Sequence, residues 1–170
     1  MNKKKLIISP HVDDDVLGVG GILDKNTFVL YCGLNESDFP SNIERPSMQA
    51  RVLEAETVSL FTGHKYDILE NKVNHYKITD LINIFEMYIN KFKPDEIYIP
   101  YPSYNQDHRK FNPNYFIPID IDKKIQAYKL MQTQVRSFRS PETLKSMAQL
   151  RGQQSNCDYA EAFQTIRWID

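Results

Sequence analysis

The sequence predicts an α/β domain with a Rossmann-like, mostly parallel sheet flanked by helices. Short apolar runs typical of buried strands alternate along the chain with longer stretches of helical periodicity. Two polar clusters directly follow predicted strands, and ligands bind at the carboxyl ends of the strands in such sheets. A length of 170 residues without a linker or an internal repeat predicts a single domain over residues 1–170.

The first half of the chain begins with an unbroken apolar run at residues 5–9, the pattern of a central strand buried on both faces. After Pro10, apolar residues at positions 16, 19, 22 and 23 predict a helix. Strong β formers at 27–32 predict a second strand. A helix is expected from Pro46 to about Phe61, because proline suits a first helical turn and Gly63 is a stop signal.

The second half continues the alternation. The expected strands are 66–69, 96–99 and 115–119, and the expected helices are 79–92, 122–135 and 142–151. The 79–92 helix is amphipathic, with one predicted apolar stripe made of Leu81, Ile82, Phe85, Tyr88, Ile89 and Phe92. Pro118 lacks a backbone donor, which favours an edge position for the last strand.

The composition excludes several classes of protein. The chain is 41% hydrophobic and 25% charged, as folded globular domains are. Its 21 basic and 22 acidic residues give a formal charge of −1, so we expect no nucleic-acid partner. The apolar runs are too short to cross a bilayer, and Cys32 and Cys157 fit single thiols in a reducing compartment. We expect a cytoplasmic protein without a membrane partner, and the sequence leaves a homo-oligomer open.

The first polar cluster is Pro10-His11-Val12-Asp13-Asp14-Asp15. Three carboxylates at the end of a buried strand are costly, because like charges repel and burial disfavours ionisation. A divalent cation would remove that cost, with His11 and one aspartate facing the ion and another aspartate facing a bound water. Capping of a helix N-terminus is the alternative, and we favour it for Asp15 alone. For the whole set, capping leaves the histidine unexplained.

The second polar cluster, Asn105-Gln106-Asp107-His108, follows the predicted strand 96–99. A lone loop histidine is usually a solvated side chain, but at this edge His108 could complete a His/Asp/His set. Three protein ligands with a fourth position left to water are the pattern of catalytic zinc. His64 and His75 have no such context, and we interpret them as surface or structural residues.

Five segments, in order, resemble the signatures of the PIG-L/LmbE-like family of metal-dependent N-deacetylases. Residues 10–21 resemble its Pro-His-Pro-Asp-Asp-Glu motif followed by Leu-Gly-x-Gly-Gly, and 105–108 resemble its His-x-Asp-His or Asn-x-Asp-His motif. The other three resemble its Arg-x-x-Glu, Arg-Gly and Tyr-Ala-Glu-x-Phe segments, at residues 51–54, 151–152 and 159–163. The resemblance covers about residues 4 to 167.

This resemblance implies a metal site and a general base. His11, Asp14 and His108 would bind a divalent metal, usually Zn²⁺, with Fe²⁺ as an alternative. Asp13 would deprotonate the attacking water and later pass the proton to the leaving amine. The implied reaction is hydrolysis of the N-acetyl group of an N-acetylglucosamine-type sugar conjugate, so the expected partner is a small-molecule amino sugar.

Three further residues have implied or open roles. Arg51 would reach polar groups of the substrate, or it is an exposed helix arginine paired with Glu54 or another acid. Asn105 stands where some members have a histidine that helps to stabilise the oxyanion, and an amide donates a hydrogen bond without a full positive charge. Glu161 is expected to be structural rather than catalytic.

The chain departs from the family pattern at three places. Val12 and Asp15 replace a proline and a glutamate, neither of which would ligate the metal. Several tens of residues that normally flank the active site are missing between Lys110 and Phe111. Either the protein is a shortened version with a more open site, or a segment is missing from the sequence at this junction. A normal peptide bond between Lys110 and Phe111 would exclude the second explanation.

Other functions remain as alternatives. A degenerate member could bind metal or sugar without turnover, and the same machinery could hydrolyse another amide. A receiver-like domain with Asp67 as phosphoacceptor is disfavoured, because Asp67 falls inside a strand and no role is left for His11 or His108. A dinucleotide site at residues 18–21 is disfavoured because the preceding acidic turn would repel a pyrophosphate.

Overall fold

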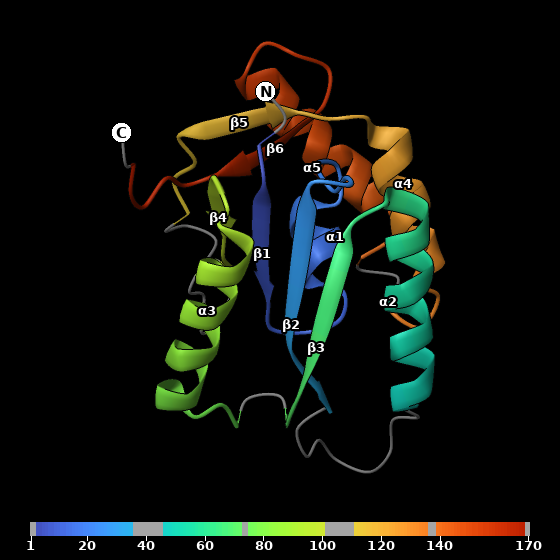
Figure 1. Ribbon diagram of the computed structural model, residues 1–170. Coiled ribbons are helices and arrows are strands. Elements are labelled where there is room, and N and C mark those ends of the chain that lie inside the picture. The colour runs from blue at the N-terminus through green and yellow to red at the C-terminus, as the bar shows by residue number, and fades with distance from the viewer. Residues whose placement is uncertain (1–2, 36–45, 73–74, 101–110, 136–138, 169–170) are drawn as a thin grey trace.

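A computed structural model describes residues 3–35, 46–72, 75–100, 111–135 and 139–168 (Figure 1). The strands are β1 (Lys5–Ser9), β2 (Thr27–Asn35), β3 (Lys65–Lys72), β4 (Glu96–Tyr98), β5 (Tyr115–Pro118) and β6 (Ala160–Phe163). The helices are α1 (Asp14–Val19), α2 (Met48–Thr62), α3 (Ile78–Phe92), α4 (Ile121–Leu130) and α5 (Pro141–Gln154). This order confirms the predicted α/β fold.

The central sheet has four parallel strands in the order β3-β2-β1-β4. Leu6 of β1 lies opposite Phe28 of β2 on one side and Ile97 of β4 on the other. The chain adds strands in one direction from β1 to β3 and then returns to the other side of β1. The strand order therefore reverses between β1 and β4, and such a switch point is where open α/β sheets bind ligands.

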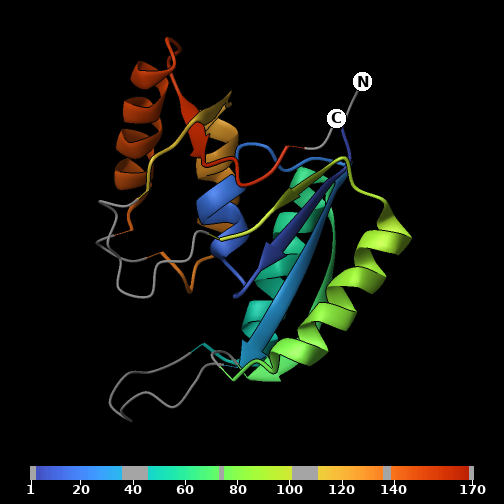
Figure 2. The ribbon, with the colours of Figure 1, turned by 90° about the vertical axis from the view of Figure 1, so that its left-hand side faces the viewer.

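Helices cover both faces of this sheet (Figures 1 and 2). Helix α3 lies on one face, and α1, α2 and α4 lie on the other. Successive side chains of a strand point to opposite faces, so Leu6 and Ile8 pack with α3 while Ile7 packs with the other helices. This double burial explains why the β1 run is continuously apolar.

Strands β5 and β6 form a separate antiparallel pair. The predicted strand at 115–119 is therefore present, but it does not extend the central sheet. Both members of a two-stranded sheet are edges, which accommodates Pro118 opposite Ala160. Strand β6 was not predicted, because its residues Ala-Glu-Ala-Phe include few β formers.

Helix boundaries and faces also differ from expectation. Helix α1 ends at Val19 rather than near residue 23, and a Cβ on the following Gly20 would clash with the Val16 carbonyl oxygen. Helix α3 is amphipathic as predicted, but the assignment of Ile82 to the buried stripe is wrong, because it is 50% exposed. Ile84 packs against the core on this side instead.

The interpretation of His64 and His75 as structural or surface residues is confirmed. His64 is buried beside the Thr62 hydroxyl, and His75 is exposed. Cys32 and Cys157 are free thiols.

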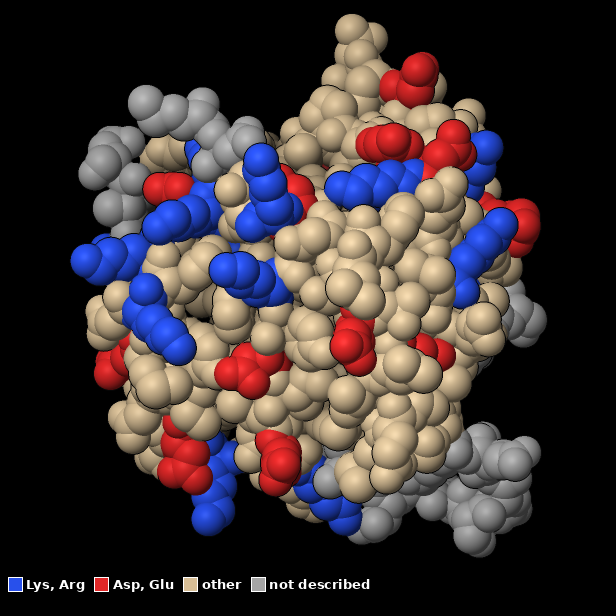
Figure 3. Space-filling model, turned by 45° about the vertical axis from the view of Figure 1, so that its right-hand side comes forward, with Lys and Arg blue, Asp and Glu red and all other residues tan. Residues whose placement is uncertain are grey.

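Acidic and basic side chains are interspersed over the face drawn in Figure 3. No helix within the described ranges combines the length and apolar character needed to span a membrane.

Candidate metal centre

The candidate site lies in the turn between β1 and α1, at the carboxyl edge of the sheet. Strand β1 ends at Ser9, whose buried hydroxyl donates to the His11 carbonyl at 2.7 Å and shapes the turn. The Tyr76 hydroxyl, from the segment before α3, donates to the Pro10 carbonyl at 2.9 Å. Helix α1 starts at Asp14, so strand end, turn and helix start hold the cluster together.

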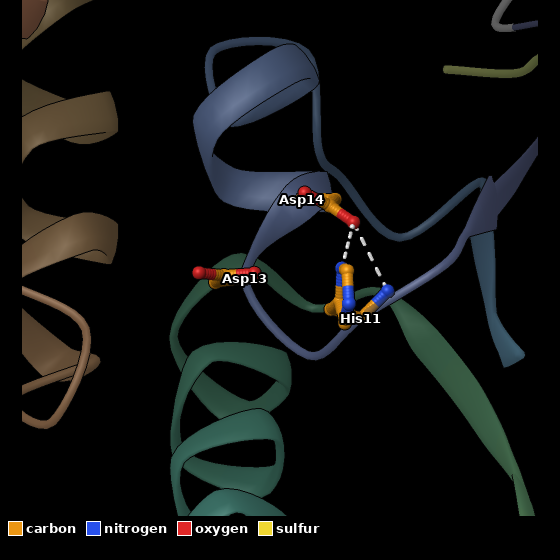
Figure 4. Close-up of side chains that lie close together, drawn as sticks. All are labelled: His11, Asp13 and Asp14. Atoms are coloured by element: carbon orange, nitrogen blue, oxygen red, sulfur yellow. Dashed lines mark hydrogen bonds and ion pairs between the residues drawn. The ribbon is translucent and has the colours of Figure 1, made fainter. Parts of the chain in front are cut away.

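His11, Asp13 and Asp14 each offer one potential ligand atom within 4.8 Å of the others. Nδ1 of His11 lies 3.0 Å from Oδ2 of Asp14, which also accepts the His11 backbone N–H (Figure 4). Two ligands of a tetrahedral zinc ion are roughly 3.4 Å apart, given metal–ligand distances near 2.1 Å. The imidazole–carboxylate donor set and its spacing therefore fit Zn²⁺ or Fe²⁺ with a small displacement.

Asp13 is oriented differently from this pair. It occupies the N-cap position of α1, but its side chain makes no capping hydrogen bond and is only 7% exposed. Burial, followed by the charge of Asp14, raises the pKa of Asp13 to about 6. Three cations lower it, namely Arg139, His11 and Arg51. A buried carboxyl group with a pKa near neutrality suits a general base.

The predicted position of Asp15 at the start of a helix is confirmed, but Asp15 is not the N-cap residue. Asp15 lies in the first turn of α1, but Asp13 holds the N-cap position. The Asp15 side chain is fully buried and accepts a hydrogen bond from the Tyr31 hydroxyl at 2.8 Å. Burial raises the pKa of Asp15 to about 7. The β1–α1 turn thus carries two buried acids whose ionisation is unfavourable.

Arg51 lies on α2 and is 4% exposed, so the interpretation as an exposed helix arginine is wrong. Its charge lowers the pKa values of both His11 and Asp13, which places it near the cluster. The Glu54 carboxylate accepts hydrogen bonds from the backbone and hydroxyl of Thr133, each at 2.7 Å. The predicted contact of Arg51 with substrate stays a prediction.

The second polar cluster lies outside the described residues. Asn105 and His108 belong to residues 101–110, as does Lys110 at the predicted deletion, so these assignments stay predictions. Strand β4 ends at Tyr98, which pairs with Ile7 of β1. The chain therefore leaves β4 at the edge of the sheet where the described part of the site lies.

Arg139 is a site residue that the sequence analysis missed. Its Nη1 donates to Oδ2 of Asp13 at 3.3 Å, across 126 positions of sequence. No local motif surrounds Arg139, so only the packing of the fold brings it to the cluster.

A shallow depression lined by Met48, Gln49, Val52, Leu53 and Glu56 lies on the outer side of α2 and shares no residue with the site.

No family model and no curated protein matches the chain. Solved structures do match. A conserved protein from Thermus thermophilus has a TM-score of 0.77 at 18% identity, covering 97% of this chain and 95% of that one. N,N'-diacetylchitobiose deacetylase from Pyrococcus horikoshii has 0.74 at 19% identity, covering 95% and 83%. The 4-carboxy-2-hydroxymuconate hydratase GalB from Pseudomonas putida has 0.72 at 17%, covering 98% of each chain.

At these identities the similarity is one of fold. A zinc-inhibited form of the teicoplanin deacetylase Orf2 also matches, with a TM-score of 0.67 at 12% identity, covering 93% of this chain and 96% of that one. The same architecture thus carries deacetylases and a hydratase, and the reaction has to be argued from the site. The chain has the single-domain α/β fold of these deacetylases, with a His–Asp–Asp cluster at the switch point of its sheet.

Proposed function

We propose that this chain is a metal-dependent hydrolase that removes the N-acetyl group from an N-acetylglucosamine-type sugar conjugate. The observation that carries the proposal is the His11–Asp13–Asp14 cluster at the carboxyl end of β1. Support comes from the fold shared with N,N'-diacetylchitobiose deacetylase and teicoplanin deacetylase. The ordered sequence motifs point to the same chemistry.

His11 and Asp14 are the proposed metal ligands in the described part of the chain, with His108 as the third. Zn²⁺ is the proposed ion, and Fe²⁺ is the alternative. Such an ion polarises an amide carbonyl and lowers the pKa of a coordinated water. His11 and Asp14 have exposed side-chain fractions of 36% and 34%, so the pair is open to solvent and substrate.

Asp13 is the proposed general base. Its carboxylate takes a proton from the attacking water as the water oxygen bonds to the acetyl carbon. When the carbon–nitrogen bond breaks, Asp13 returns the proton to nitrogen, and acetate and a free amine leave. A pKa near 6 lets one group act both as base and as acid around neutral pH. Asn105 is the proposed hydrogen-bond donor to the oxyanion, and Arg51 the proposed contact to the sugar.

One specific observation favours a second candidate, a degenerate protein that binds metal or sugar without turnover. The sequence runs directly from Lys110 to Phe111, where the resembling family carries a segment that flanks the active site. A site that has lost this flank could keep its metal ligands and still fail to hold the acetamide. No observation favours the receiver alternative, since Asp67 lies within β3 and accepts a hydrogen bond from Tyr88.

The test is release of primary amine from a panel of N-acetylglucosaminides by metal-loaded and chelator-stripped protein. Metal-dependent release, lost in Asp13→Ala at unchanged metal content, is the expected result. Asp24→Ala is the matched control, because Asp24 pairs with Lys5 at the start of β1, the end of the strand opposite to the site. Bound metal without release from any substrate would favour the binding-only protein, and release by Asp13→Ala would remove Asp13 from the base role.

A further inference from the structure

Arg139 is fixed in place by its backbone. The hydroxyl of the fully buried Tyr128 on α4 lies 2.7 Å from the Arg139 carbonyl oxygen and 3.0 Å from that of Gln134. Directly after Arg139, Ser140 caps α5 by accepting the Thr143 backbone N–H at 3.2 Å. The residue is therefore held between two helices, and the start of its side chain is fixed with them.

The side chain of Arg139 extends from this anchor to the β1–α1 turn. Its Nη1 reaches Oδ2 of Asp13 at 3.3 Å, while the arginine side chain stays 39% exposed. Figure 4 shows Asp13 projecting to the opposite side of the turn from the His11–Asp14 pair, toward the α4–α5 part of the chain. One Asp13 oxygen nevertheless stays within 4.8 Å of the ligand atoms of His11 and Asp14.

Asp13 needs such a contact because α1 does not orient it. Its side chain makes no hydrogen bond to the helix end that it precedes. A carboxylate without a fixed partner rotates, and a displacement of about 1 Å at a reacting group costs up to roughly 10²-fold in rate. A guanidinium is a planar donor that fixes both the position and the direction of a carboxylate, whereas an ammonium fixes only the position.

We propose that Arg139 is a positioning residue for Asp13: its guanidinium fixes the Asp13 carboxylate in one orientation, in which one carboxylate oxygen lies within 4.8 Å of the ligand atoms of His11 and Asp14. The inference rests on the proposed function, in which Asp13 is the general base. It assigns a role in the site to a residue 126 positions away in sequence. A purely structural ion pair between α1 and the α4–α5 connection is the competing explanation.

The test is a double-mutant cycle of Arg139→Met and Asp13→Asn, with Arg139→Lys as the conservative variant. We expect Arg139→Met to lower kcat by about 10- to 100-fold at little change in KM and metal content. Arg139→Lys should recover part of this loss, because it keeps the charge without the planar fork. Arg151→Met is the matched control on α5, since Arg151 bonds the exposed Gln154. It should change neither parameter.

A second readout does not depend on turnover. In Co²⁺-substituted protein, Arg139→Met and Asp13→Asn should shift the visible absorption in the same direction, and Arg139→Met should add no further shift in the Asp13→Asn background. The proposal would be overturned if Arg139→Met kept the kcat and the absorption spectrum of wild type. It would also be overturned if Arg139→Met had the same effect on kcat or on the spectrum in wild type and in the Asp13→Asn background. Spectral coupling in a protein without turnover would refute the deacetylase and leave the positioning role standing.

Discussion

The two ends of the short helix α1 are built in opposite ways. At its C-terminal end, Lys124 donates to the Leu17 carbonyl at 2.9 Å and to Oε1 of Glu161 at 2.6 Å. The same Glu161 oxygen accepts the Gly21 backbone N–H at 2.8 Å. Lys5 and Lys123 donate to the carbonyl groups of Ile22 and Leu23, shortly after the end of the helix. Cations at the end of a helix are favourable, and this end is well compensated.

The N-terminal end is only partly compensated, by the ion pair between Arg139 and Asp13. Asp13 and Asp15 are buried, and burial raises their pKa values to about 6 and about 7, for Asp13 despite the charges of Arg139 and Arg51. The C-terminal end of α1 is thus stabilised by an ion pair and by lysine hydrogen bonds, whereas the N-terminal end carries closely spaced acids. A bound cation would lower the free energy of the acidic end most, and this contrast is the physical basis for placing the metal there.

His11→Ala should have the largest effect, because it removes a proposed metal ligand at the acidic end of α1. We expect metal affinity to fall by at least about 100-fold and amine release to fall to background. The measurement is metal content after dialysis together with the release assay. His75→Ala, at an exposed histidine, is the control. Normal metal content in His11→Ala would contradict the assignment.

Asp13→Asn should separate chemistry from metal binding at the same end. The amide keeps the volume of the side chain but is a poor proton acceptor, so kcat should fall by about 10²- to 10⁴-fold. Metal content should stay within experimental error of wild type. The release assay and metal analysis, run on one preparation, check both statements. A parallel loss of metal would make Asp13 a ligand instead of the base.

Lys124→Met tests the compensated end. Removing the lysine leaves Glu161 charged and buried, and breaking a buried pair costs about 3–5 kcal/mol in the free energy of unfolding. Lys124→Met with Glu161→Leu should recover part of this loss, because an apolar pair carries no buried charge. Denaturant unfolding of the chelated proteins measures both. The folded variants should bind metal with the affinity of wild type. A large loss of metal affinity would contradict the distinction between a stabilising C-terminal end and a metal-binding N-terminal end of α1.

His64→Gln gives the smallest expected effect and isolates burial without a charged neighbour. Burial lowers the pKa of His64 to about 4, below its value of about 6.5 in an unfolded chain. The unfolded state therefore binds the extra proton between these values. Wild type should lose stability relative to His64→Gln by up to about 1.4 kcal/mol per pH unit as the pH falls from 6.5 to 4. Parallel unfolding curves across this window would refute the depressed pKa.

The features that could be predicted from the sequence are those that depend on residues close together in the chain. The apolar run of β1 and the acids that follow it are adjacent in the chain. The electrostatic cost of acids at the end of a buried strand could therefore be predicted without knowledge of the fold. The burial of Arg51 could not be predicted, because α2 carries apolar residues on both faces. Val58 is buried while Leu53 is 62% exposed, and periodicity does not say which face is inward. The Arg139–Asp13 contact depends on packing between distant segments.

The central claim is that the acidic end of α1 is a divalent metal site. Its most direct test is titration of Zn²⁺ into chelator-stripped wild type, His11→Ala and Lys124→Met, followed by calorimetry. We expect one ion per chain with a Kd below about 1 μM in wild type and Lys124→Met, and an affinity at least about 100-fold lower in His11→Ala. Equal binding by wild type and His11→Ala, or no binding by either, would contradict it.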